Sequence, residues 1–354
     1  MNLKYNQSKK SPFKFFLVII IIIMLITVLV DISSNEQQLN IPGNAGILHL
    51  STCQNYLVAF TKDNHVHLWD WNDLPGDPLQ SSVSAYPAVV LDSDKILIYE
   101  PKDHNSLVIR KNATHDTVTE FPLSSSYHLT HIAATRNRSM LAVLLENTSN
   151  KGDNASNVYQ LVTIHPVTEQ YQPIINIGGE TAGYQLNQCA VSDDRKWVII
   201  LGARQDEGVI IVIDISQKKI VREIDIPGVK IFDHAAFEPE GAWFFAGGDD
   251  LVLYQIQTDS GQILSRIPTD EEKETIVSTI AFFDIDVSPD GKAVAAITTT
   301  RKGGVWDCAS GKKFIKSIAG SKISSTVAFS PDSRLLAVGP LQAGGQISIF
   351  RLPE

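Results

Sequence analysis

The sequence predicts an all-β domain of about seven similar units, preceded by one N-terminal membrane-spanning helix. Two observations support this prediction. A long apolar run lies within the first 32 residues, and strand-and-turn patterns then recur at intervals of roughly 42–45 residues up to the C-terminus. No stretch after the apolar run shows sustained 3.6-residue periodicity of its apolar residues, which disfavours helical repeats.

The N-terminal segment is predicted to anchor the chain in a membrane. After a basic tail at residues 1–12, the segment Phe13–Ile32 supplies 20 residues, including five consecutive isoleucines. A helix of that length spans the roughly 30 Å hydrocarbon core of a bilayer. The first 30 residues hold four lysines and no acidic residue. We therefore expect the tail to be cytoplasmic, and the chain beyond a linker at 33–36 to be extracytoplasmic, that is periplasmic, extracellular or lumenal.

The competing interpretation of this segment is a cleaved secretory signal. The apolar run exceeds the roughly 7–15 residues usual for such a signal, and the segment from Val28 to Ser34 offers no small-residue cleavage site. Both features favour a retained signal anchor.

Charge and cysteine content restrict the function of the outer segment. Removing the four lysines of the first 30 residues from the 30 basic residues leaves 26 against 39 acidic residues, a net charge of about −13 for residues 31–354. No clustered basic stripe occurs, so nucleic acid is not expected as a partner. Cys53, Cys189 and Cys308 are far apart and odd in number, so we expect neither a disulfide framework nor a zinc site.

The repeats are clearest near the C-terminus. The segments Ile285–Ala296 and Val327–Val338 share the turn Ser-Pro-Asp, and Ser288 and Ser330 are 42 residues apart. Weaker copies occur at 190–200 and 236–246, and fainter ones begin near His49, Val90 and Ile132. Each copy predicts two short strands joined by a polar turn.

A third, alternating strand is predicted to follow each pair, with a fourth strand in several units. The third strands are expected at 65–71, 107–110, 158–165, 209–215, 251–257, 304–308 and 347–352. Four short antiparallel strands in each of seven units predict a seven-bladed β-propeller over residues 37–354. The last unit lacks a fourth strand, so residues 37–41 are expected to complete it and close the ring.

These units resemble WD-repeat β-propellers. The resemblance covers nearly all of residues 37–354 and rests on the turn Ser288-Pro-Asp-Gly291 and on the dipeptides Trp69-Asp70 and Trp306-Asp307. The Gly-His dipeptide of that family is absent, Asp233-His234 being a partial echo, and most units lack Trp-Asp. The buried polar network of the family is therefore not carried over to this chain.

Residues that could carry chemistry are few. His65 and His67 point to the same side of a strand, and with Trp69 they are expected to pack between sheets rather than bind metal. His128 and His131 are expected in a loop at a blade entrance. Asp284 and Asp286 flank Ile285 on an inner strand, so both carboxylates could line the central channel as an ion or substrate site, or simply form a solvated wall.

No catalytic motif is present. The sequence lacks Gly-x-Ser-x-Gly, and the glycine pairs at 178–179, 247–248, 303–304 and 344–345 are expected in hairpin turns. No cofactor, metal or catalytic residue is assigned. Four Asn-x-Ser/Thr triplets, at Asn112, Asn137, Asn147 and Asn154, are glycosylation acceptors if the source is eukaryotic, or else chance products of composition.

The loops offer a stronger functional indication. Turns between second and third strands should emerge at the same end of a propeller as the connections between blades; we call this end the loop face. Several of these loops are long and hold charged residues, which gives the predicted interaction face Arg204, Asp206, Glu207, Asp249, Asp250, Asp270, Glu271, Glu272, Glu274, Arg301 and Lys302. Loops on a rigid scaffold concentrate binding residues, so a basic or mixed-charge protein partner is expected, with a merely solvated rim as the alternative.

The sequence thus favours a membrane-tethered, non-catalytic propeller that acts as a protein-interaction scaffold or ligand-recognition module outside the cytoplasm. The alternative is a propeller enzyme, such as a quinone-cofactor dehydrogenase or a hydrolase, that uses acidic residues of the channel. A role in assembling neighbouring membrane proteins is a third possibility. Fold alone does not separate these functions.

Overall fold

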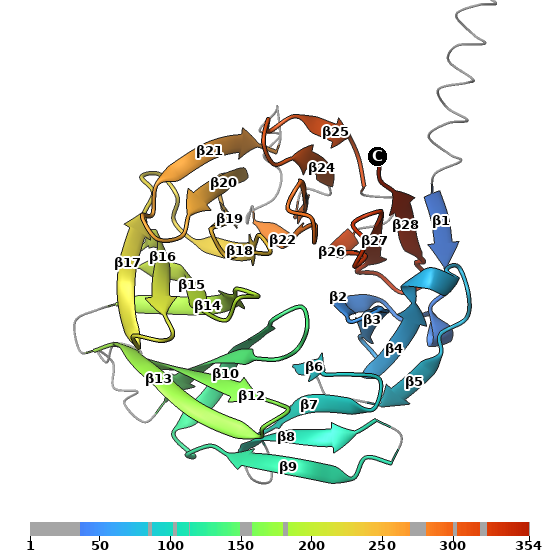
Figure 1. Ribbon diagram of the computed structural model, residues 1–354, viewed down its shortest axis with the longest axis horizontal. Coiled ribbons are helices and arrows are strands. Elements are labelled where there is room, and N and C mark those ends of the chain that lie inside the picture. The colour runs from blue at the N-terminus through green and yellow to red at the C-terminus, as the bar shows by residue number, and fades with distance from the viewer. Residues whose placement is uncertain are drawn as a thin grey trace, which may run out of the picture. The chain divides into compact units, whose positions relative to one another are not determined.

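The computed structural model describes residues 36–353 except for 84–86, 102–104, 113, 149–157, 180–182, 270–280, 300–302 and 319–323. One compact unit comprises Gln38–Glu354, and only Glu36 and Gln37 of the preceding unit are described. The described strands form seven four-stranded sheets arranged as the blades of a ring (Figure 1). The prediction of an all-β seven-bladed propeller is confirmed.

Six blades are each made by one continuous segment whose strands pair antiparallel in chain order, and the seventh combines both ends of the propeller. Blade 1 contains β2 (Ile47–Cys53), β3 (Tyr56–Thr61), β4 (His65–Asp70) and β5 (Gln80–Val83); blade 2 contains β6 (Ala88–Val90), β7 (Lys95–Glu100), β8 (Ser106–Lys111) and β9 (Thr117–Pro122); blade 3 contains β10 (Tyr127–Ala134), β11 (Leu141–Asn147), β12 (Val158–His165) and β13 (Gln170–Gly178). Blade 4 contains β14 (Tyr184–Val191), β15 (Trp197–Arg204), β16 (Glu207–Asp214) and β17 (Lys219–Asp225); blade 5 contains β18 (Phe232–Phe237), β19 (Trp243–Gly248), β20 (Val252–Gln257) and β21 (Ile263–Pro268); blade 6 contains β22 (Phe282–Val287), β23 (Ala293–Thr298), β24 (Gly303–Asp307) and β25 (Lys313–Ile315). Blade 7 contains β26 (Ser324–Phe329), β27 (Leu335–Pro340), β28 (Ile347–Arg351) and β1 (Glu36–Leu39), and two short 3-10 helices lie at Pro42–Asn44 and Trp71–Asp73.

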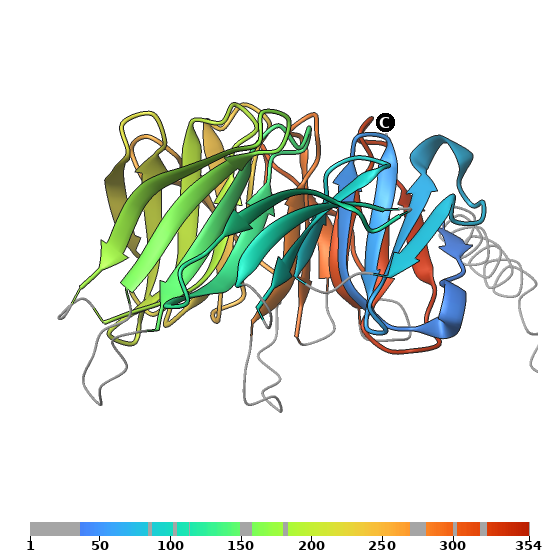
Figure 2. The same ribbon diagram turned by 90° about the horizontal axis from the view of Figure 1, so that it is seen from below.

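The first strand of each blade is innermost and the fourth is outermost, and the strands run between the two ends of the ring (Figures 1 and 2). Turns between first and second strands lie at one end, which we call the hairpin end, opposite the loop face. A repeated hydroxyl builds several of these turns. In blade 6, Ser288 Oγ donates to Asp290 Oδ1 at 2.6 Å and accepts from the Ala293 N–H at 2.9 Å. The same pair of bonds recurs at Ser192, Ser330 and, with Asn137, at Thr135.

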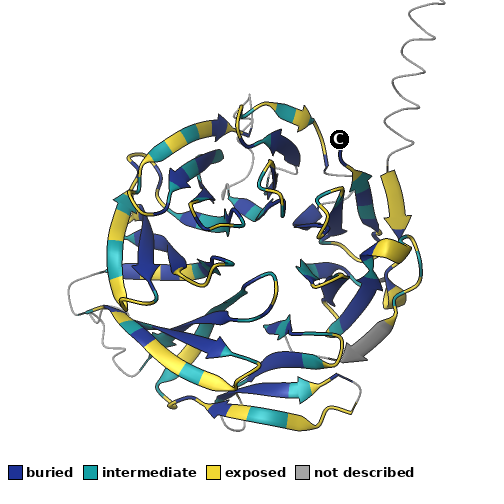
Figure 3. Ribbon diagram, viewed as in Figure 1, coloured by how far each residue is buried: buried dark blue, intermediate teal, exposed yellow. Residues whose placement is uncertain are grey.

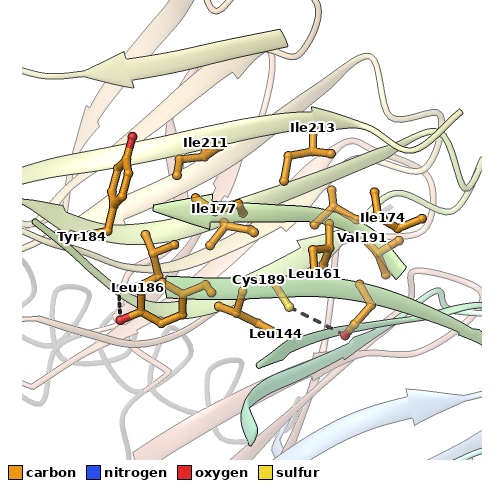
Figure 4. Close-up of a cluster of buried hydrophobic side chains, with 14 of the residues drawn as sticks. Leu144, Leu161, Ile174, Ile177, Tyr184, Leu186, Cys189, Val191, Ile211 and Ile213 are labelled. Atoms are coloured by element: carbon orange, nitrogen blue, oxygen red, sulfur yellow. Dashed lines mark hydrogen bonds between the residues drawn. The ribbon is translucent and has the colours of Figure 1, made fainter. Parts of the chain in front are cut away.

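Apolar layers between neighbouring blades hold the ring together. The second and third strands are buried on both faces, whereas the outer strands alternate buried and exposed residues (Figure 3). Between blades 3 and 4, Leu144 and Leu161 pack with Leu186 and Ile211 in one cluster (Figure 4). These continuous apolar runs explain why each short strand is stable only beside the next blade.

The closing strand lies where the sequence predicted an N-terminal strand to complete the last blade. β1 borders β28 in blade 7, Leu39 is 1% exposed, and Gln38 Nε2 donates to Ser348 Oγ at 3.1 Å. Beyond the strand, Gln346 Nε2 donates to Asn40 Oδ1 at 2.5 Å. The ring is therefore fastened by two segments more than 300 residues apart in the chain.

Two expectations about individual residues were wrong. His128 and His131 lie within β10 rather than in a loop, because a bulge between Leu129 and His131 breaks the strict alternation that the sequence pattern assumed. Gly247 and Gly248 end β19, and Gly303 and Gly304 begin β24, instead of forming turns. A Cβ at Gly247 would lie 2.4 Å from the ring of Phe282 in the next blade, so close packing is the reason for glycine there.

The prediction that His67 and Trp69 pack between sheets is confirmed. Both residues lie on β4, and each is at least 98% buried. No helix among the described residues is long and apolar enough to cross a bilayer. The predicted membrane segment Phe13–Ile32 and the linker that follows lie outside the described residues.

Candidate functional site: the central cavity

A cavity of about 830 Å³ occupies the centre of the ring. The inner strands or adjoining residues of all seven blades line it. This volume is in the range of about 300–1,000 Å³ typical of small-molecule sites. Polar groups from separate blades converge on this cavity, so we take it as the candidate site.

A polar ring, one residue from each of six blades, lines this cavity. In each of these inner strands a bulge immediately precedes the residue, turning its side chain toward the centre. The polar ring consists of His49, His131, Gln188, His234, Asp284 and Thr326. Blade 2 differs, because β6 has only three residues and Pro87 contributes to the lining just before it.

Contacts between blades link one half of the polar ring. Gln188 Nε2 and His234 Nδ1 are 2.9 Å apart, and His234 Nδ1 is 3.8 Å from Asp284 Oδ1. Thr326 Oγ1 donates to Asp284 Oδ2 at 2.6 Å and accepts from the Leu50 N–H at 2.9 Å. A chain of polar contacts thus connects blades 4, 5, 6, 7 and 1 around the cavity.

Burial keeps the imidazoles of the polar ring uncharged. It lowers the pKa of His49 and of His131 to about 4 and that of His234 to about 3, with mutual repulsion among the three as a further cause for His49 and His234. Each of these three histidine side chains keeps some exposed surface, but that surface faces the cavity rather than open solvent. At neutral pH the imidazoles therefore offer one donor and one acceptor each.

The carboxyl groups of the cavity are shifted the other way. Burial raises the pKa of Asp284 to about 7, although the hydrogen bond from Thr326 opposes the shift. Burial also raises the pKa of Asp286, against the attraction of Arg136. The prediction that both carboxylates line the channel is confirmed. Asp284 is accordingly a group whose protonation changes near neutral pH.

Two arginines of blade 3 lie at the hairpin end of the cavity. Arg136 Nη2 donates to the Val287 carbonyl of blade 6 at 2.5 Å, so its side chain crosses the ring. Its Nε lies 3.6 Å from Asp193 Oδ2 of blade 4. Arg138 Nη2 donates to the Thr52 carbonyl of blade 1 at 2.8 Å. These bonds between blades that are not neighbours narrow the cavity at this end.

One pair in the cavity has the composition of a thiol–imidazole dyad but not its electrostatics. Cys189 Sγ lies 3.5 Å from His131 Nδ1. Burial raises the pKa of the Cys189 thiol to about 12, and the residue is 2% exposed. A nucleophilic cysteine requires the thiolate, so Cys189 is a packing residue here. Within the described part of the chain, no three His, Cys, Asp or Glu side chains gather closely enough to hold one metal ion.

The described members of the predicted interaction face lie at the loop face, in the turns after β15 and β19. Asp206 and Glu207 are exposed. Arg204 instead pairs with Glu223 and, at 2.8 Å, with Asp225 of its own blade.

The other two described carboxylates of the predicted interaction face accept hydrogen bonds from groups of blade 5. Asp249 Oδ1 accepts from the Lys230 N–H at 2.9 Å, and Asp250 accepts a hydrogen bond from the Tyr254 hydroxyl. The remaining predicted members lie outside the described residues: Asp270, Glu271, Glu272, Glu274, Arg301 and Lys302.

Sequence reasoning missed five members of the polar ring, namely His49, His131, Gln188, His234 and Thr326. The signal was available for four of them: like Asp284 before Ser288, each stands four residues before the first residue of its turn, and these four are His131, Gln188, His234 and Thr326. Aligning the repeats on the turn would have revealed a polar column in otherwise apolar strands. Among the asparagines of the glycosylation triplets, Asn112 is 2% exposed, so its side chain is inaccessible in the folded protein.

Comparison with known proteins finds no matching protein-family model and no matching curated protein. The likeness to WD-repeat propellers therefore rests on the fold and on the few turn residues named above.

Proposed function

We propose that the protein is a non-catalytic recognition module, tethered to a membrane with its propeller on the extracytoplasmic side, which binds a small ligand in the central cavity and presents the loop face to a protein partner. The central cavity carries this proposal. It is built by all seven blades, and its polar groups converge from separate strands on one central space. Rigid scaffolds that position polar groups around an enclosed space are typical of ligand sites.

Filling the cavity tests ligand recognition. Ala236 lies on β18, two residues beyond His234, and lines the cavity. Ala236→Phe should remove a small molecule that copurifies with the full chain, as detected by native mass spectrometry. Val167→Phe is the matched control, since Val167 is 87% exposed and does not line the cavity. Equal ligand content in both variants would contradict the proposal.

The proposed tether is tested separately. The apolar segment Phe13–Ile32 should keep the full chain in the membrane fraction after alkaline extraction, whereas a chain beginning at residue 33 should be released. Protease added outside intact cells should digest the propeller. Protection of the propeller from that protease would reverse the proposed orientation.

The partner surface is tested by charge neutralisation. Asp206→Asn with Glu207→Gln should weaken crosslinking to a basic partner at least several-fold, and neutralising Asp270, Glu271, Glu272 and Glu274 should add to the loss. Glu36→Gln provides a control on an outer strand. Unchanged crosslinking in both neutralised sets would leave the loop face a solvated rim.

One observation favours an enzyme as the second candidate. Asp284 has a pKa raised to about 7 and lies beside His234, a combination that suits general acid–base catalysis of a hydrolysis. Turnover of a copurifying ligand by the wild-type chain and its loss in Asp284→Asn would favour this candidate. Binding without turnover favours recognition.

A further inference from the structure

The arginines at the hairpin end of the cavity are not equally neutralised. Arg136 lies beside Asp193, and its charge also acts on Asp286. Arg138 is 8% exposed, and no described carboxylate lies within ion-pairing distance of it. Its Nε has no hydrogen-bond partner. Arg138 is therefore a buried guanidinium that has no ion-pair partner among the described residues.

Burying such a charge without a paired counter-ion is costly, because the ion loses its hydration. The contacts that Arg138 makes do not require its charge. Its bond to the Thr52 carbonyl needs only one N–H donor, which a neutral amide also supplies. Its other neighbour is the buried thiol of Cys53, whose pKa burial raises. A bridge between blades 3 and 1 does not explain why an arginine occupies this position.

The negative charge of Asp193, which acts on Arg138, is shared with Arg136. His49, whose pKa Arg138 lowers further, is held neutral by burial. Burial raises the pKa of Asp193, against the attraction of Arg136 and Arg138, and its ion pair is with Arg136. Arg138 itself lines the cavity, with His131 of the same strand-and-turn unit and His49 of blade 1 on the wall. The cavity wall thus combines a positive charge with uncharged imidazole donors.

We propose that the central cavity binds a small organic anion, with its carboxylate paired to the guanidinium of Arg138 and its uncharged body lying along the imidazoles of His49 and His131. This inference rests on the proposed cavity recognition and specifies its ligand class. A guanidinium presents a planar fork of donors that matches a carboxylate. An anion bound there supplies the counter-charge that Arg138 lacks. The cavity volume accommodates an organic body in addition to the carboxylate.

A matched pair of probes tests the charge requirement. 4-Fluorobenzoate and 4-fluorobenzamide have nearly the same shape and differ in charge, and ¹⁹F NMR titration of the full chain in neutral detergent measures the binding of each. We expect saturable binding of 4-fluorobenzoate and at least tenfold weaker binding of 4-fluorobenzamide. Micelles without protein correct for partition of the probes.

Variants locate the site. Arg138→Gln should weaken 4-fluorobenzoate binding at least tenfold, and Arg138→Lys should give an intermediate affinity because it keeps a charge without the planar fork. Arg351→Gln is the control, since Arg351 is exposed at the end of β28 and does not line the cavity. If Arg138→Gln fails to fold, as judged by circular dichroism, the comparison of Arg138→Lys with the wild-type chain decides.

Three outcomes would overturn the inference. They are equal affinity for the two probes, equal affinity in Arg138→Gln and Arg351→Gln, and no detectable binding of 4-fluorobenzoate to the wild-type chain. Binding of 4-fluorobenzamide that Ala236→Phe abolishes would leave cavity recognition standing while removing the anion. Failure of the proposed function is therefore distinguishable from failure of this inference.

Discussion

The layers between blades and the wall of the central cavity are built from the same strands but differ in chemistry. Between blades 4 and 5 the layer is wholly apolar, with Phe244 packed edge-on to Phe237 at 5.5 Å. On the cavity wall, the neighbouring inner strands carry imidazoles, a carboxyl with a raised pKa and a buried arginine. Apolar burial stabilises the fold, whereas buried polar groups are costly unless paired. Stability therefore resides in the layers, whereas the wall carries the polar groups that a ligand could contact.

The largest expected effect comes from opening a layer. Phe244→Ala removes a fully buried ring and should lower the free energy of unfolding by about 3–5 kcal/mol, measured by urea denaturation. Phe314→Ala, at a ring that is 37% exposed, should change it by less than about 1 kcal/mol. A similar loss of unfolding free energy in the two variants would mean that the buried layers contribute no more to stability than the exposed surface does.

The closing strand extends this test to the point where the ring is fastened. Leu39→Ala should lower the free energy of unfolding by about 2–4 kcal/mol, because Leu39 packs in the cluster that joins blades 7 and 1. Leu79→Ala, at a side chain that is 60% exposed, is the control. An unchanged unfolding midpoint for Leu39→Ala would mean that β1 does not fasten the ring.

On the cavity wall, Thr326→Val removes a hydroxyl with little change in shape. The Leu50 N–H and Asp284 Oδ2 each lose a partner, so the free energy of unfolding should fall by about 1–3 kcal/mol. The lost bond stabilised the ionised carboxylate, so the pKa of Asp284 should rise further above its present value of about 7. Carboxyl ¹³C NMR measures that pKa, and no upward shift would contradict the contact.

His234→Asn gives the smallest expected effect, which depends on pH. The pKa of His234 is about 3 in the folded protein and near 6.5 when unfolded, so the unfolded chain binds its proton first as the pH falls. The wild-type chain should lose stability relative to the variant by about 1–2 kcal/mol between pH 7 and pH 5. His128→Asn, at an exposed position of β10, should show no such trend. A pH-independent difference for His234→Asn would mean that this imidazole is not buried as described.

Much of the fold could be predicted from the sequence because its signals are local. The turn at Ser288 needs only a hydroxyl, a carboxylate two residues later and a backbone N–H, all within six residues. Such turns, together with the fainter strand patterns of the other units, predict seven blades, and the unpaired last unit predicts the closing strand. Asp284 and Asp286 were placed on the cavity wall by strand alternation alone.

The site was predicted only in part because its residues converge from distant segments. Bulges at the start of the inner strands shift the alternation, which placed His131 in a loop on sequence grounds although it lies on the cavity wall. Nothing local to residues 136–138 indicates that Arg136 reaches a carbonyl 151 residues away, or that Arg138 reaches one 86 residues away. Strand and turn preferences act between near neighbours, and so the sequence by itself determined the blades, their number and the turn chemistry. Only ring closure decided which polar groups share the cavity, because burial and pairing depend on side chains from all seven blades at once.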